Sequence, residues 1–110
     1  MDKRQENYRG VFDSALGFGH KPALIVIDFM KAYTEVGSAL YTPAVVEAVH
    51  ASVDLVNKAR EKNIPVIYTK VLYQNGGFDG GLFVKKIPVL QSLVEGEPLA
   101  EIDPHIAPIK

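Results

Sequence analysis

The sequence predicts an α/β protein built on a parallel sheet, and three observations support that prediction. Residues 23–28 and 65–69 are short, almost continuously apolar runs rich in β-branched residues, the pattern of strands buried on both faces of a parallel sheet. Between them, valines recur at steps of three and four residues, the spacing of one apolar helical face. Strand, helix and strand in this order form a βαβ unit, whose crossover should be right-handed.

The connecting helix has recognisable start and stop signals. Thr42 suits the N-cap and Pro43 the first helical position. The helix should end near Asn63, because Pro65 follows closely. Its predicted apolar face consists of Val46, Val49, Val53 and Val56.

The remaining chain divides into segments around this unit. Residues 1–21 form a polar-to-mixed leader, residues 22–73 the βαβ core, and residues 74–110 a flexible glycine-rich loop with an irregular tail, in which 87–94 has some helical character. Together they form a single domain at most. Two parallel strands leave both sheet edges open and bury little apolar surface, so we expect the chain to be the first half of a larger domain.

Composition excludes several classes of function. The chain has 110 residues, 47% of them apolar and 23% charged, which is ordinary for a globular protein. Its 12 basic and 13 acidic residues give a net charge of -1, so nothing favours nucleic-acid binding. No apolar run is long enough to span a membrane, and residues 1–10 are not followed by the apolar core of a signal peptide. We therefore expect a cytoplasmic protein without membrane contact.

The first apolar run ends on a carboxylate, Asp28. Functional groups gather at the carboxyl ends of parallel strands, where an aspartate suits a general base, a metal ligand or a phosphoacceptor. A strand-end aspartate that only accepts hydrogen bonds from loop amides is the alternative. Lys70 ends the second run and could face the same side, although a solvated side chain is the simpler interpretation.

Other motifs favour no cofactor and no metal. Gly17-x-Gly19 precedes the strand and lacks a third glycine, so it is not a dinucleotide fingerprint. The glycines of residues 76–81 are followed by Leu82-Phe83 in place of the lysine and hydroxyl residue of a phosphate loop. The histidines do not have the spacing of metal ligands. They are His20, His50 and His105.

Three longer segments resemble a known family. They are YRGVFDSALGFGHKPALIVIDFMKAYTEVGSALY, IPVIYTKVLY and GGLFVKKIPVLQSLVEGEPLAEIDPHIAP. They resemble the isochorismatase-like cysteine hydrolases, and among these the N-carbamoylsarcosine amidohydrolase group. The resemblance implies a three-layer αβα sandwich around a parallel sheet, in proteins close to twice this length. It also implies hydrolysis of an amide C–N bond, or of a vinyl ether in isochorismatases, by a Cys, Asp and Lys triad.

On that resemblance Asp28 is the triad aspartate, which takes the proton from the cysteine thiol so that a thiolate attacks the carbonyl carbon. The chain contains no cysteine. Lys110 lacks the sequence context of the triad lysine, and Phe29-Met30 stand where one branch of the family has a metal-binding Asp-x-His motif. We therefore expect this polypeptide to be inactive alone, because a triad without its nucleophile loses several orders of magnitude in rate.

Three functions follow from these observations. The first is the amino-terminal half of an amidohydrolase for a small amide or carbamoyl substrate, working as a homo-oligomer or with a complementing chain that supplies Cys and Lys. The second is a non-catalytic structural or oligomerisation module derived from the family. The third is a phosphoacceptor module, which the absence of a second acid at Phe29 and the Tyr68-Thr69-Lys70 strand end disfavour.

Overall fold

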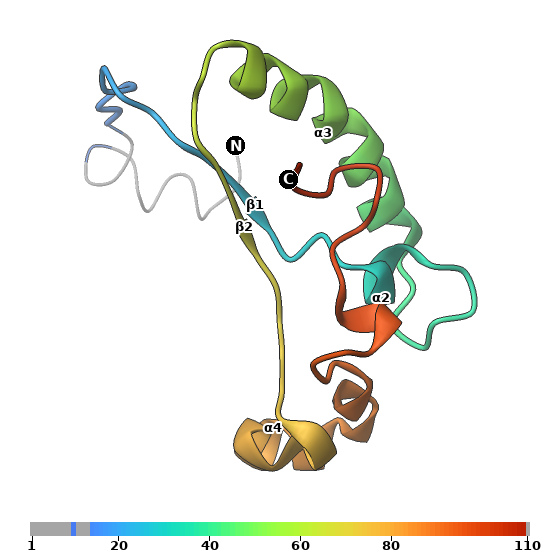
Figure 1. Cartoon of the computed structure of the whole chain (residues 1–110). Helices are drawn as coiled ribbons and strands as arrows, with labels where there is room; N and C mark the ends of the chain where they lie inside the picture. The colour runs from blue at the N-terminus through green and yellow to red at the C-terminus, as the bar shows by residue number, and fades with distance from the viewer. Residues whose placement is uncertain (1–9, 11–13, 110) are drawn as a thin grey trace.

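The computed structural model describes residue 10 and residues 14–109. Strand β1 (Leu24–Ile27) and strand β2 (Val66–Thr69) pair in parallel, and helix α3 (Pro43–Glu61) connects them. Figure 1 shows α3 on one side of the two strands. The predicted βαβ unit is confirmed, with both strands at the predicted positions.

Helix α3 has the predicted start and end, with one difference. Pro43 occupies the first helical position, and Asn63 has the left-handed φ of 56° just beyond the last turn. Thr42 is the N-cap residue, but its hydroxyl donates to the carbonyl of Leu40 at 3.1 Å and makes no capping hydrogen bond. The start of the helix therefore depends more on Pro43, whose φ is already helical and which has no N–H to satisfy.

One face of the sheet is covered and the other is open. Val26 packs in a core cluster with Val49 and Val56 of α3. On the opposite face, Ile25, Ile27 and Ile67 are 53%, 63% and 49% exposed. The expectation of burial on both faces is wrong for the described residues, because their helices cover one face only.

The chain turns sharply after β1. Helix α2 (Lys31–Thr34) follows at once, and its residue Ala32 is fully buried. The core cluster around α2 contains Met30, Ala32, Val84, Leu90, Leu93 and Ala100. Four of these six residues come from the segment expected to be a loop and tail, so that segment is packed and not loose.

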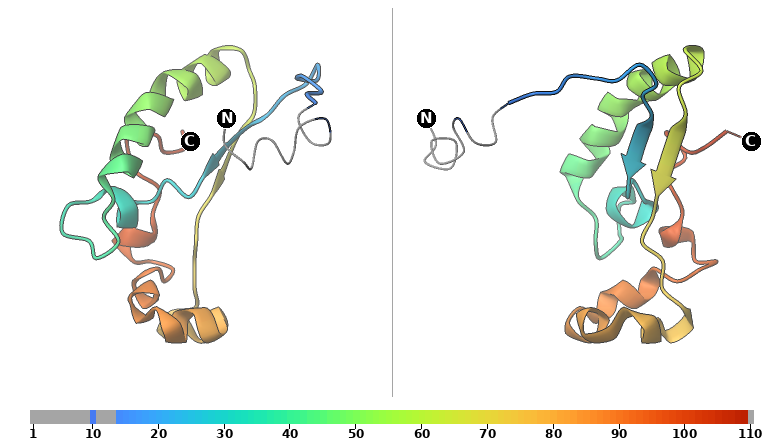
Figure 2. Two further views of the ribbon diagram at one scale, coloured as in Figure 1. Left: turned by 180° about the vertical axis from the view of Figure 1, so that it is seen from behind. Right: turned by 90° about the vertical axis from the view of Figure 1, so that its left-hand side faces the viewer.

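Short helices occupy much of that segment. They are η1 (Asn75–Gly80), α4 (Gly81–Lys86), η2 (Pro88–Ser92) and η3 (Pro98–Ala100). The α-helix lies earlier than the helical piece expected at 87–94, where the structure has the 3-10 turn η2. Gly76 and Gly77 adopt φ values of 81° and 71°, which glycine adopts without steric cost. Both views of Figure 2 show the strands pointing toward the end of the molecule that holds α4.

The C-terminal segment, residues 101–109, is anchored beside the sheet. Ile106 joins the core cluster of Val26, and its carbonyl accepts a hydrogen bond of 2.6 Å from the hydroxyl of Tyr68. Arg60 of α3 donates to that Tyr68 hydroxyl at 2.8 Å and to the carbonyl of Ala107 at 3.0 Å. These bonds connect β2, α3 and the C-terminal segment. Among the described residues, no helix has the length and apolar content needed to cross a membrane.

Candidate functional site

Asp28 lies at the carboxyl end of β1, beside the last residue of β2. Its backbone N–H points at both oxygen atoms of Thr69, the carbonyl and Oγ1, each at 3.1 Å. In return, Thr69 Oγ1 donates to Asp28 Oδ1 at 2.7 Å. The carboxylate is thus held in one orientation at the edge of the sheet where parallel-sheet proteins place their functional groups.

The backbone of Asp28 is unusual. Its φ is 57°, in the left-handed region that residues other than glycine rarely adopt, although Asp is among those enriched there. The N–H of Met30 donates to the carbonyl of Asp28 at 2.9 Å, which closes a tight turn between β1 and α2. Strained backbone of this kind costs about 1–3 kcal/mol and clusters at functional sites.

Two tyrosines belong to the same region. Burial raises the pKa of Tyr33, and the charges of Asp28 and Tyr73 raise it further. Tyr33 and Tyr73 also pack against the same core cluster, around Met30 and Ala32. Tyr33 lies on α2 and Tyr73 follows β2, so the two connections after the strands bring them together. Sequence reasoning missed both tyrosines, since neither belongs to a motif.

Lys70 forms an ion pair with Glu101. Its Nζ lies 3.4 Å from the carboxylate of Glu101 in the C-terminal segment. Both side chains are partly exposed, so this ion pair adds little stability. The solvated lysine expected from the sequence is thus a partly exposed lysine with an acidic partner.

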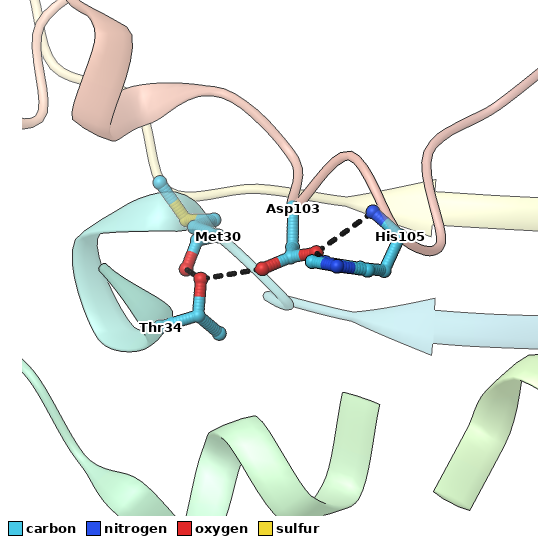
Figure 3. A network of polar contacts seen from close by, with 4 residues as sticks. All are labelled: Met30, Thr34, Asp103 and His105. Atoms are coloured by element: carbon cyan, nitrogen blue, oxygen red, sulfur yellow. Dashed lines mark hydrogen bonds and ion pairs between the residues drawn. The ribbon is translucent and has the colours of Figure 1, made fainter. Parts of the chain in front are cut away.

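Asp103 is a second carboxylate of interest, and it is buried. Its exposed fraction is 7%. Figure 3 shows the Asp103 side chain between Thr34 and His105. Thr34 Oγ1 donates to Oδ2 at 2.6 Å, and the backbone N–H of His105 donates to Oδ1 at 2.8 Å. Burial opposes ionisation of Asp103, but the hydrogen bonds from Thr34 and His105 outweigh it, so the pKa of this carboxyl group is lowered.

Asp103 ties α2 to the C-terminal segment. The N–H of Asp103 also donates to the carbonyl of Phe29 at 2.8 Å, next to the turn that carries Asp28. The network therefore supports the local structure that follows β1. Sequence reasoning missed this network because Thr34 lies 69 residues from Asp103, although His105 is only two residues from it.

Comparison with known proteins identifies the family. A model described as "Isochorismatase domain" matches residues 22–110. The chain belongs to the isochorismatase family. The family resemblance expected from the sequence is thereby confirmed, and so is an α/β fold of isochorismatase type, present here in part.

Relatives of this isochorismatase-family chain include two enzymes. It is 46% identical over 105 residues to "Maleamate amidohydrolase" of Pseudomonas putida, covering 94% of this chain and 49% of that protein. It is 38% identical over 108 residues to "N-carbamoylsarcosine amidase" of an Arthrobacter species, covering 93% of this chain and 40% of that protein. The chain thus spans about half the length of these relatives or less.

A solved structure has the same fold. The crystal structure of a cysteine hydrolase from Pseudomonas syringae pv. phaseolicola superposes with a TM-score of 0.75 and 27% identity. The match covers 82% of this chain and 43% of that one. The catalytic role of Asp28 stays a prediction, and Lys110 lies outside the described residues.

Proposed function

We propose that this chain supplies the aspartate part of a cysteine-dependent amidohydrolase site for a small amide or carbamoyl compound. The observation that carries the proposal is the position of Asp28, fixed by Thr69 at the carboxyl edge of the sheet in an isochorismatase-family chain. The buried Asp103 network supports it by holding the turn after β1 in place.

The chemistry divides between this chain and residues outside it. Asp28 accepts the proton of a cysteine thiol, and the resulting thiolate attacks the carbonyl carbon of the substrate. A lysine and backbone amides stabilise the negative charge that develops on sulfur and oxygen. These 110 residues contain no cysteine, so the nucleophile comes from other residues of a longer protein or from a second chain.

The open parts of the sheet offer a place for that complement. Within the described residues the sheet has two strands, so the side of β1 away from β2 has no strand partner there. A groove of about 270 Å³ beside β1 is lined by residues that include Ile27, Ser52 and Leu55. The exposed face of Ile25, Ile27 and Ile67 continues this apolar surface. Unpaired strand edges readily accept another strand, so the complementing residues would extend the sheet at β1.

A split-enzyme experiment tests the proposal. The chain is mixed or co-expressed with the part of the Pseudomonas putida maleamate amidohydrolase that it does not match, and ammonia release from maleamate and N-carbamoylsarcosine is measured. The chain alone should release none, and the mixture should release ammonia. Asp28→Asn should abolish the activity of the mixture. Glu61→Gln, which removes an exposed carboxylate paired with Lys58 at the far end of α3, should leave it unchanged.

Two results would count against this function. Ammonia release by the chain alone, at the rate of the mixture, would show that no thiol is needed. Full activity of the Asp28→Asn mixture would show that this carboxylate is not the base. A mixture that forms a complex without any activity would also count against the catalytic role of this chain.

The second candidate is a non-catalytic assembly module. The exposed isoleucines of the sheet favour it, since a second copy could cover them. Size-exclusion chromatography with light scattering distinguishes the two functions. A module of this type should form a homo-oligomer that Ile25→Glu disrupts, whereas a chain awaiting its complement should associate with the missing half in preference to itself.

A further inference from the structure

The fold brings two histidines together that are far apart in the sequence. His50 lies on α3 and His105 in the C-terminal segment, and their ring centres are 5.0 Å apart with the planes at 64°. Both side chains reach the surface, since His50 is exposed and the His105 side chain is 61% exposed. His105 belongs to the Asp103 network described above, and His50 brings a second imidazole beside it.

His105 is oriented by the buried carboxylate of Asp103. Its Nδ1 lies 2.8 Å from Asp103 Oδ1, and its backbone N–H donates to the same oxygen at 2.8 Å. In the tautomer that donates the Nδ1 proton to this carboxylate, Nε2 keeps its lone pair. A carboxylate that holds one ring nitrogen while the other stays free is the usual arrangement at metal-binding histidines, because it fixes the tautomer and raises the basicity of the ligand.

We propose that His50 and His105 bind a divalent transition-metal ion, such as Zn²⁺ or Cu²⁺, which links α3 to the C-terminal segment. Imidazole nitrogen binds zinc at about 2.0–2.1 Å, so two rings on one tetrahedral ion have their centres about 5 Å apart. The observed separation of 5.0 Å matches this spacing.

The site would use two protein ligands and water. No three histidine or acidic side chains converge on a metal position within the described residues, so solvent completes the coordination. Glu47 and Asp54 are three residues before and four residues after His50, on the same side of α3, and add negative charge around it. The Irving–Williams order places Cu²⁺ above Zn²⁺ in affinity for such imidazole ligands.

Binding of this kind stabilises the folded chain. The two histidines are adjacent only when the C-terminal segment is packed beside α3, so the metal binds the folded state in preference to the unfolded one. The unfolding temperature should therefore rise with metal concentration and return when a chelator is added. Asp28 is not one of the proposed ligands, and metal binding and melting are measured without any activity, so this inference stands apart from the proposed function.

The test uses the untagged chain. Isothermal titration with Zn²⁺ measures the affinity, a thermal melt measures the stabilisation, and electron paramagnetic resonance of the Cu²⁺ form counts the bound nitrogens. We expect one ion per chain and two nitrogen ligands. His50→Gln and His105→Gln should each lower the affinity by about tenfold or more, since even the loss of a residue that only orients a ligand costs about that much. His20→Gln, a matched change outside the pair, should behave as the wild type.

His50→Gln is the variant least able to disturb the fold, because His50 is exposed on a helix and glutamine is a good helix former. The double variant His50→Gln/His105→Gln measures the background metal binding that other side chains of the chain contribute. Zn²⁺ binding of equal strength in the wild type and the double variant would overturn the proposal. So would a loss of binding in His20→Gln, or a melting temperature that metal raises equally in every variant.

Discussion

The hydroxyl of Thr69 and the carboxylate of Asp28 hold each other across the ends of the two strands. Thr69 Oγ1 donates to Asp28 Oδ1 at 2.7 Å, and the N–H of Asp28 points back at that hydroxyl at 3.1 Å. The strand register places Thr69 opposite Ile27, one residue before Asp28. The orientation of the carboxylate is therefore set by the neighbouring strand.

Thr69→Val should remove the hydrogen bond that orients the Asp28 carboxylate. Valine keeps the β-branched shape but cannot donate, so we expect the free energy of unfolding in urea to fall by about 0.5–1.5 kcal/mol. Thr69→Ser keeps the hydroxyl and should lose less. In the complemented enzyme, Thr69→Val should lower kcat more than it changes KM, because a misplaced base affects the chemical step. An unfolding free energy that is the same for both variants would contradict the role of this hydroxyl.

Thr34→Val should destabilise the chain through Asp103. The hydroxyl of Thr34 donates to this buried carboxylate, and its loss leaves the oxygen without a partner at a cost of about 1–3 kcal/mol. Thr42→Val is the matched control, since the Thr42 hydroxyl is exposed and makes no capping bond. Urea denaturation of both variants measures the difference. Equal stability of the two would show that the Asp103 network is dispensable.

Gly80→Ala should also be destabilising. A Cβ at Gly80 would lie 2.0 Å from Cγ2 of Val84, which is buried, and 3.0 Å from a ring carbon of Tyr73. Overpacking of this kind costs about 1–3 kcal/mol. Gly19→Ala meets no atom within 4 Å and should stay within about 0.5 kcal/mol of the wild type. A melting temperature of Gly80→Ala equal to that of Gly19→Ala would contradict the packing around Val84.

Alkaline pH should destabilise the chain through Tyr33. Burial and the charges of Asp28 and Tyr73 raise the pKa of Tyr33 above its ordinary value of 10.0. Below pH 10.0 Tyr33 is protonated in both the folded and the unfolded state, and its contribution to the free energy of unfolding is fully present. As the pH rises further, Tyr33 ionises first in the unfolded state. Its contribution to stability is lost as the pH passes through the raised pKa of the folded state. Tyr33→Phe lacks this group, so its urea midpoint should fall less than that of the wild type between neutral and alkaline pH, whereas parallel curves would refute the assignment.

Local sequence patterns predicted the βαβ unit well. Thr42-Pro43 and Asn63 marked the ends of α3, and the two apolar runs became β1 and β2. The glycine-rich segment and the tail were harder, because short helical turns there depend on packing against α2 and not on a repeating pattern. Asp103 in the tail shows this dependence on packing, since its hydrogen-bond partner Thr34 lies far away in the sequence.

The candidate site, too, could be predicted only in part from the local sequence. The position of Asp28 at a strand end could be predicted from the apolar run before it, whereas its hydrogen bonds with Thr69 could not. Hydrogen bonds of this kind require a strand register and a turn geometry that no local motif encodes. The pairing of His50 with His105 likewise depends on the C-terminal segment packing beside α3.

The sequence by itself determined the family, the order of strand and helix, and the absence of a cysteine nucleophile, because these depend on residue identity and on local periodicity. Only the tertiary structure decided which side chains hold Asp28, which carboxylate is buried, and which face of the sheet stays open. The physical reason is that hydrogen bonds and burial depend on distances between residues far apart in the chain, and those distances are fixed only when the elements pack.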